Sequence, residues 1–475
     1  MASVHPEPNE VAKRIEAHQL WLTLNGKQGQ RADLSGAVFE DADLTDTNFQ
    51  RAELRRADFG KSTLRRTNFR EADLQNANLE NAQSLLSTQL AGADVAGAKL
   101  PEAIAEFEGL KTIAEASSNA QKLFIAMLAG CLYSWLTIGT TKDAALLTNS
   151  ASSPLPVIGT ALPIVGFYLV APVVLVALYF YFHLNMQRLW EALADLPAVF
   201  PDGRPLDKMA DPWLLNGLVR AHFFRLRGER PPLSRLQQWL SILLAWWVVP
   251  ATLVVFWGRF LMRHDWFGTA LHIILLTAAI GFGWMSYRLA RATLRGEPRK
   301  PFVWRQAWKD LRTYKRIAGV SAACALGVIL YRFSVDAIEG GPSYARHSPI
   351  FARHGSSLQK VVLRNLETLR NLETIGFSPF ANFHGEDVST KPSNWTGKPE
   401  EYPLVKGARL VGARMEYADA RDAFLVNAVL SGANLSNANL QDARLDSANL
   451  SPLNFLSLRT SRRPISYPPT SAART

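Results

Sequence analysis

The chain has 475 residues, and its 52 lysines and arginines against 41 aspartates and glutamates give a formal net charge of +11. This length leaves room for about three structural units, and the excess positive charge favours an anionic partner, which a membrane surface provides as well as a nucleic acid does. Cys131 and Cys324 are the only two cysteines and lie in apolar runs, so the sequence indicates neither a disulfide framework nor a thiolate metal site.

The N-terminus combines a polar start with a short helical pattern. Residues Met1 to Asn9 lack the apolar core of a cleavable signal peptide, so we expect the chain to begin in the cytoplasm. Apolar residues from Val11 to Leu24 then recur at roughly helical spacing. We predict that residues 1–30 form a capping helix that covers the exposed end of the next domain.

An apolar residue occupies every fifth position between residues 34 and 79, with a small residue two places before it. Because this period matches neither helix nor strand, the repeat is a structural unit of its own, stacked as in solenoids. The predicted core residues of this first block are Leu34, Phe39, Leu44, Phe49, Leu54, Phe59, Leu64, Phe69, Leu74 and Leu79. The pattern then resumes one residue out of register, from Leu85 to Leu100, and we predict that the block covers residues 31–110.

Segments such as Ala32-Asp33-Leu34 and Ala77-Asn78-Leu79 resemble the unit of the pentapeptide-repeat family, which reads Ala-(Asp/Asn)-Leu-X-X. The resemblance implies a right-handed, four-sided β-helix, in which the central Leu or Phe and the small residue point inward. Four pentapeptides would form one coil, and successive coils would stack at about 4.8 Å with backbone hydrogen bonds between them.

Charged residues twenty positions apart should lie one above the other in such a coil. The stacked pairs are Asp41 with Lys61, Asp46 with Arg66, and Arg51 with Glu71. Residues 55–56 and 65–66 are all arginine and project from opposite faces, so the positive charges form a girdle rather than a patch. Solvated edges with weak ion pairs are therefore favoured over a nucleic-acid interface.

Four long apolar runs without Asp, Glu, Lys or Arg follow the first block, and each is long enough to cross a bilayer. The predicted spans are residues 123–141, 155–182, 239–257 and 267–287, with a shorter fifth candidate at 317–331. Together they predict a transmembrane helical region over residues 111–335. A buried helical core in a soluble protein is the alternative, but four separate charge-free runs disfavour it.

Lysine and arginine concentrate in two loops of this region, residues 185–238 and 288–316, whereas residues 142–154 contain one Lys and one Asp. The positive-inside rule places both basic loops in the cytoplasm. We therefore predict a multi-pass protein of a bacterial-type inner (cytoplasmic) membrane, with a cytoplasmic N-terminus. The candidate contacts with anionic lipid head groups are Arg220, Arg225, Arg227, Arg299 and Lys300.

The C-terminal part is predicted as a connecting region at 336–403, a second repeat block at 404–456, and a disordered tail at 457–475. The predicted core residues of the second block are Leu425, Leu430, Leu435, Leu440, Leu445 and Leu450. The expected fold class is therefore mixed, with pentapeptide-repeat β-helix blocks flanking an α-helical transmembrane region. If the fifth candidate crosses the membrane, the second block lies outside; if it is re-entrant, both blocks share the cytoplasm.

We find no sequence motif that indicates a catalytic or nucleotide-binding site: the sequence has no P-loop, dinucleotide-binding turn, His-Glu-x-x-His segment or nucleophile elbow. We predict no catalytic residue, no cofactor and no metal. His272 lies inside the fourth run, where a satisfied structural polar group is favoured over a functional site.

The sequence predicts a membrane-anchored scaffold that contacts membrane lipids and an unidentified protein partner. A homo-oligomer, in which the partner is a second copy of the chain, is one of the alternatives. A channel or pore-forming effector, with the repeats as a sensor or oligomerisation domain, is the alternative. A soluble nucleic-acid binder is a third hypothesis, and it predicts a steep salt dependence of binding.

Overall fold

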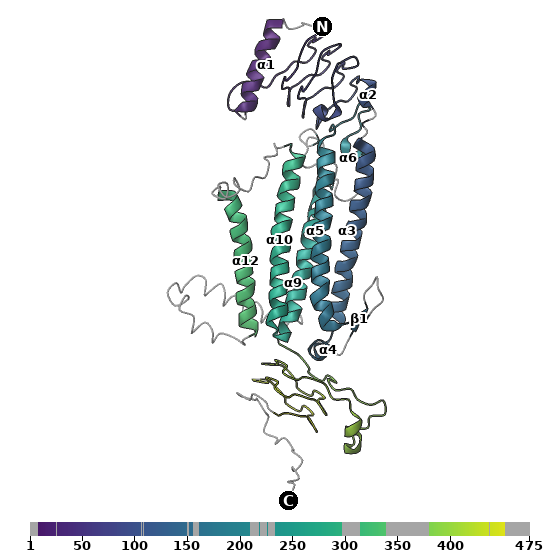
Figure 1. Cartoon of the computed structure of the whole chain (residues 1–475), viewed down its shortest axis with the longest axis vertical. Coiled ribbons are helices and arrows are strands. Elements are labelled where there is room, and N and C mark those ends of the chain that lie inside the picture. Colours follow the sequence, from purple (N-terminus) through teal and green to yellow (C-terminus); the bar gives the residue numbers. More distant parts are fainter. Residues whose placement is uncertain are drawn as a thin grey trace, which may run out of the picture. The chain divides into compact units, whose positions relative to one another are not determined.

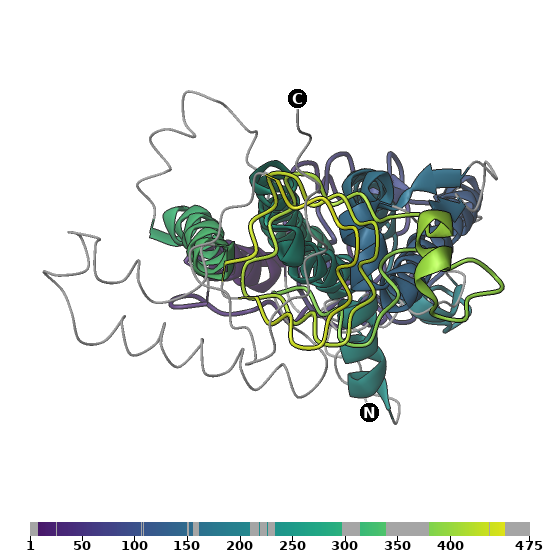
Figure 2. The same cartoon turned by 90° about the horizontal axis from the view of Figure 1, so that it is seen from below.

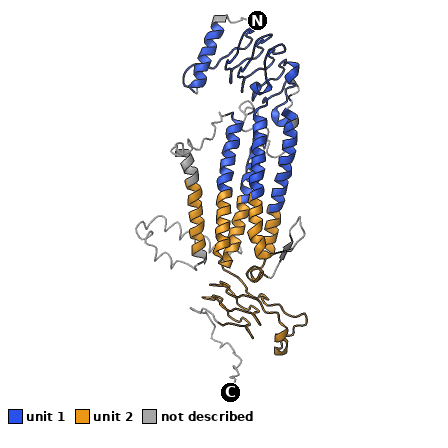
Figure 3. Ribbon diagram, in the orientation of Figure 1, with its two compact units in different colours: residues 1–130, 177–249, 279–317 blue, residues 131–176, 250–278, 318–475 orange. Residues whose placement is uncertain are grey.

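The computed structural model describes residues 8–24, 26–105, 107, 109–149, 152–154, 161–209, 218, 226, 233–296, 314–338, 380–436 and 438–451. Two compact units are distinguished in Figure 3. Unit 1 comprises residues 1–130, 177–249 and 279–317, and unit 2 comprises residues 131–176, 250–278 and 318–475. Residues 339–379 of the predicted connecting region and the predicted tail at 457–475 lie outside the described residues.

Figure 1 labels the described helices except α8; along the chain, α1 precedes the first repeat block, and the helices from α2 to α12 lie between the two blocks. Their bounds are α1 Pro8–Thr23, α2 Glu102–Ala105, α3 Gly109–Thr140, α4 Asp143–Thr148, α5 Ile164–Ala194, α6 Leu206–Met209, α8 Ser234–Ile242, α9 Val248–Phe260, α10 Trp266–Leu294 and α12 Tyr314–Ile338. A π-helical turn, Leu243–Trp247, connects α8 to α9, and a 3₁₀ turn, Leu261–Arg263, follows α9. Two short strands, β1 Ser152–Pro154 and β2 Ala161–Pro163, pair antiparallel before α5.

Four helical stretches are long and apolar enough to cross a membrane, namely Thr112–Thr140, Ile164–Ala194, Arg235–Arg263 and Trp266–Leu294. The second stretch begins nine residues later than the apolar run at 155, because β2 and Pro163 precede the first helical turn. The fifth candidate, 317–331, lies in α12, whose apolar part Ser321–Val335 is shorter than the other four. Large apolar side chains on these helices stay exposed, for example Leu136 and Ile274, as expected of surfaces that face lipid.

The first repeat block, in unit 1, is a stack of coils joined by parallel backbone bridges between residues twenty apart. Asp33 pairs with Glu53, for example, and Glu53 in turn pairs with Asp73. All ten predicted core residues of this block are buried. The phenylalanines stack from coil to coil, with ring centroids of Phe39 and Phe59 4.9 Å apart, so the repeated large side chains form one continuous apolar column.

The register change after Leu79 has a local structural cause. The last bridges of the block join residues 21 apart, such as Asp73 with Asp94, instead of twenty. A 3₁₀ turn at Ser87–Leu90 accommodates the additional residue, and Leu90 still points into the core. The insertion therefore widens one corner of the coil without interrupting the apolar column.

Both ends of the first block are covered within unit 1. Val11 and Ile15 of α1 pack against its core at the N-terminal end. The last coil is extended by the segment that follows α5: Gly92 N donates to Leu196 O at 2.8 Å and Val95 N donates to Val199 O at 3.1 Å. The chain after α5 thus pairs with backbone groups that an open solenoid end would leave without partners.

The second repeat block, in unit 2, already includes residues 382–390, which precede the boundary at 404 that the sequence suggests. Asn382 and Asp387 already form parallel bridges with Asp419 and Phe424. Residues 391–405 then leave the coil as an excursion that contains the 3₁₀ helix η6 (Pro399–Leu404), and this excursion hides the five-residue period. Figure 2 views the block end-on, with its coils superposed and the excursion to one side.

The core of the second block is less completely covered than that of the first. Leu425, Leu430 and Leu435 are buried, whereas the remaining predicted core residues, Leu440, Leu445 and Leu450, are only half-buried. These three lie in the last described coil, so no further described coil packs over them.

Candidate interaction sites on the two repeat blocks

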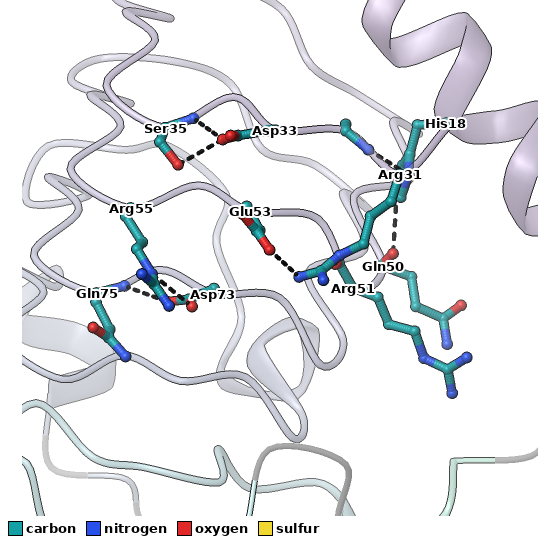
Figure 4. A network of polar contacts seen from close by, with 11 residues as sticks. His18, Arg31, Asp33, Ser35, Gln50, Arg51, Glu53, Arg55, Asp73 and Gln75 are labelled. Atoms are coloured by element: carbon teal, nitrogen blue, oxygen red, sulfur yellow. Dashed lines mark hydrogen bonds and ion pairs between the residues drawn. The ribbon is translucent and has the colours of Figure 1, made fainter. Parts of the chain in front are cut away.

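His18 joins the cap helix α1 to the first repeat block (Figure 4). Its Nδ1 accepts the backbone N–H of Ala32 at 3.1 Å, and its Nε2 lies 3.0 Å from the carbonyl oxygen of Gln50. Because a carbonyl can only accept, the ring is neutral with its proton on Nε2. Burial lowers the pKa of His18 below 6.5; the hydrogen bond to Gln50 opposes this, and the positive charge of Arg31 adds to it.

We expect the cap helix to loosen in mild acid. The folded-state pKa of His18 is lowered, so its contribution is complete above the unfolded-state pKa of about 6.5 and declines as the pH falls below that value. Protonation would place a second N–H against the Ala32 amide. Hydrogen exchange of Ala32, corrected for the intrinsic effect of pH, should accelerate between pH 7 and 5. Equal protection across that range, or an unchanged pH dependence in His18→Gln, would contradict the expectation.

A column of acidic residues runs up the same face of the first block (Figure 4). Its members, on successive coils, are Asp33, Glu53, Asp73 and Asp94. Neighbouring side chains offset their mutual repulsion: Arg31 pairs with Glu53 at 3.1 Å, and Arg55 pairs with Asp73 at 2.9 Å. The Asp73 side chain is only 2% exposed, so the surface of this face is formed by the partly exposed Glu53, Arg31 and Arg55, which carry both signs of charge.

Two of the three stacked pairs expected from the sequence form as ion pairs, Arg66 with Asp46 and Arg51 with Glu71. Lys61 is different, because it pairs with Glu40 at 3.3 Å instead of with Asp41. The Arg66–Asp46 side chains are both 60% exposed, so this pair contributes little to stability.

In unit 2 the second block contacts the helix ends through polar side chains, a set that we call the junction. Its members are Lys142, Asp143, Arg259, His264, Asn382, Glu386, Arg414, Glu416 and Asn434. Asp143 lies at its centre, because its carboxylate binds the Arg259 guanidinium at 2.5 Å and accepts the Asn382 backbone N–H at 2.8 Å. One carboxylate thus connects α4, α9 and the first coil of the second block.

The second contact in the junction is a buried pair between the turn before α10 and the second block. His264 Nδ1 lies 2.9 Å from Glu416 Oε2, and the two side chains are 1% and 9% exposed. The other carboxylate oxygen accepts Asn434 Nδ2 at 2.8 Å and Arg414 Nε at 3.3 Å. Burial raises the pKa of Glu416, but the hydrogen bond with His264 and the nearby positive charges outweigh it, so the net shift is downward.

The sequence did not indicate the junction, since its partners lie far apart in the chain and follow no motif; 152 residues separate His264 from Glu416. The five predicted lipid contacts, Arg220, Arg225, Arg227, Arg299 and Lys300, lie outside the described residues. Within the described part of the chain, no group of three or more His, Cys, Asp or Glu side chains could hold a metal ion.

Comparison with known proteins identifies the repeats. Residues 30–60, 52–83 and 413–451 match the family model for pentapeptide repeats, in 8 copies. A solved pentapeptide repeat protein from the Arabidopsis thaliana thylakoid lumen is 28% identical, with 14% of this chain and 63% of that chain covered and a TM-score of 0.07. No match was found among curated proteins. The chain thus contains pentapeptide repeats in both blocks, which imply a β-helix in each, and four long apolar helices lie between the matched segments.

Proposed function

We propose that this protein is a membrane-embedded scaffold, whose helices hold two right-handed, four-sided β-helical blocks as rigid surfaces for protein–protein contact, without catalysis. The observation that supports this most is the attachment of each block to helices within its own unit. The last coil of the first block is extended by backbone hydrogen bonds from residues 196–201, directly after α5. The second block is held by the buried pair of His264 with Glu416 and by the Asp143 carboxylate, which accepts the Asn382 backbone N–H.

Such attachments suit a binding surface. A block held in one orientation loses little conformational entropy when a partner binds, so more of the contact energy appears as affinity. The outward-facing side chains on the coils are mostly polar and charged, whereas the large apolar ones point inward. A partner would therefore recognise a fixed pattern of charges and hydrogen-bonding groups, such as the partly exposed Glu53, Arg31 and Arg55.

We propose further that the chain is a multi-pass protein of the inner (cytoplasmic) membrane, with its N-terminus in the cytoplasm. The four long apolar helices and the basic loops support this. The test is labelling of Arg65→Cys, an exposed position on the first block, after replacement of Cys131 and Cys324 by Ala. A membrane-impermeant thiol reagent should label it only after lysis. Labelling in intact cells would contradict the proposed orientation.

The scaffold function can be tested by photocrosslinking in living cells. A photoreactive residue at Arg65 or at Gln441, both exposed on the repeat blocks, should give discrete adducts with protein. The matched control position is Ile274 on α10, which is 64% exposed among apolar neighbours and should crosslink to lipid. Absence of protein adducts from both block positions would contradict the scaffold, and reproducible ion conductance in vesicles with the purified protein would favour the channel hypothesis.

A further inference from the structure

His272 is fully buried within α10, and both of its ring nitrogens face backbone carbonyl oxygens of unit 2. Nδ1 lies 2.8 Å from the carbonyl oxygen of Gly268, one turn earlier in the same helix. Nε2 lies 3.0 Å from the carbonyl oxygen of Tyr168 in α5. Carbonyl oxygens accept hydrogen bonds and cannot donate them, so each nitrogen needs a proton of its own to make a favourable contact.

The carbonyl of Tyr168 is available because of a proline one turn later. In an α-helix this oxygen would accept the N–H of residue 172, but residue 172 is proline and has no N–H. The Nε2–H of His272 therefore supplies a donor that α5 lacks. This bond accounts for the first ring proton, which a neutral imidazole also carries.

The contact at Nδ1 distinguishes the neutral ring from the charged one. In a neutral ring with its proton on Nε2, the Nδ1 lone pair would face the Gly268 oxygen at 2.8 Å, and two electron-rich atoms at that distance repel each other. A second proton at Nδ1 converts this repulsion into a charge-assisted hydrogen bond. The observed position of the ring suits an imidazolium with two donors.

The surroundings of the ring also suit a cation. Phe260 and Phe256 lie beside it, with ring centroids 5.0 and 6.2 Å from that of His272, and aromatic faces attract positive charge. Burial away from water opposes the charge, which makes the second proton exchangeable rather than permanent.

We propose that His272 is a proton-binding site within the apolar helices, and that the second proton fixes α10 against the turn of α5 that Pro172 interrupts. Among the titratable and charged groups of unit 2, Asp265 before α10 acts on the ring itself. Arg259 on α9, which pairs with Asp143, acts on the phenol of Tyr168 in α5. Arg259 and Asp143 neutralise each other, and the carboxylate of Asp265 favours the proton. Loss of the Nδ1 proton would push the ring away from Gly268 and weaken the bond to Tyr168.

The full chain offers a matched control in His183 on α5. This histidine is also buried, but its Nε2 has no hydrogen-bond partner among the described residues, so a second proton there would gain no acceptor. If His272 is a proton-binding site, it should take up a second ring proton in acid, whereas the equally buried His183 should not.

Nitrogen NMR of the histidine-labelled full chain in lipid bilayers provides the test. The nitrogen signals of His272 can be assigned in the unmodified protein by their proximity to the Tyr168 carbonyl carbon. We expect two protonated ring nitrogens at His272 at pH 4.5, and a single protonated nitrogen at His183 at every pH from 8 to 4.5. One bare nitrogen at His272 throughout that range, or parallel titration of both histidines, would overturn the proposal.

A second measurement does not depend on resolving the nitrogen signals. The thermal stabilisation that His272 gives relative to His272→Gln should stop changing with pH once the ring has taken up its second proton, because the folded and unfolded chains then carry the same charge at this residue and glutamine does not titrate. The corresponding difference for His183→Gln should keep falling down to pH 4.5, because the unfolded chain takes up a proton that the buried ring does not. A His272→Gln difference that keeps falling in parallel with that of His183→Gln would overturn the proposal.

Discussion

The substitution Leu64→Asp should unfold the first repeat block. Leu64 is fully buried in the column of apolar side chains, and its own coil is paired on both sides by backbone bridges. Removing the leucine forfeits about 2 kcal/mol of apolar burial, and the carboxylate that replaces it has no polar partner in the core, which costs several kcal/mol more. The sum exceeds about 5 kcal/mol and is comparable to the stability of a typical domain.

The matched control is Thr63→Asp, one residue earlier. Thr63 is a bridge-forming residue of the same coil and points outward, stacked on Asp43, so an aspartate there remains in contact with water. We expect a change of about 1 kcal/mol or less. Thermal unfolding by circular dichroism and protease sensitivity of residues 31–100 would distinguish the two variants. Equal stability of Leu64→Asp and the unmodified protein would contradict an inward-facing Leu64.

Loss of the Glu416 carboxylate should release the second repeat block from the junction. Glu416→Ala leaves His264 buried without its partner and removes the acceptor of Asn434. Removing one member of a buried, hydrogen-bonded pair costs about 3–5 kcal/mol. We expect backbone amides around Asn382 and Phe424 to lose protection from hydrogen exchange, whereas the helices keep theirs.

Asp446→Ala is the matched control for Glu416→Ala, because Asp446 is also a carboxylate of the second block paired with an arginine. Its pair with Arg444 spans 3.5 Å, and the two side chains are 37% and 40% exposed. An exposed pair of this kind contributes about 0.5 kcal/mol or less. If the two variants release the block equally, the junction is not what holds it.

The contribution of Glu416 should also depend on pH in a defined direction. Its folded-state pKa is lowered from 4.5, so the stabilisation is complete above about pH 4.5 and is lost as the pH falls through the lower folded-state value. The difference between the unmodified protein and Glu416→Ala should therefore shrink below pH 4.5. A difference that grows in acid would contradict this expectation.

Several features of the fold were predictable because they depend on a short period along the chain. The five-residue spacing from Leu34 to Leu79 identified the first block, and every one of those residues is buried. Four apolar runs identified the four helices that are long enough to cross a membrane. The one-residue slip after Leu79 was also visible, although the 3₁₀ turn that accommodates it was not.

The start of the second block was not predictable from its period. Residues 380–390 belong to its first coil, but the excursion at 391–405 separates them from the regular repeats that begin near Leu410. Asn382 therefore pairs with a residue 37 positions later instead of twenty. A periodic pattern identifies a coil only where the chain runs without interruption.

The repeating units and the apolar helices were determined by the sequence alone, because each depends on a pattern within one continuous segment. This pattern is the five-residue period in the blocks and the long apolar run in each helix. The tertiary structure alone decided how each block is attached to its helices. Residues 196–201 extend the first block through backbone atoms, which every residue carries and no side-chain pattern reveals. His264 and Glu416, like His272 and Tyr168, meet only after folding brings segments more than 100 residues apart into contact. Partner choice in these contacts depends on distance and burial in three dimensions, which local spacing does not encode.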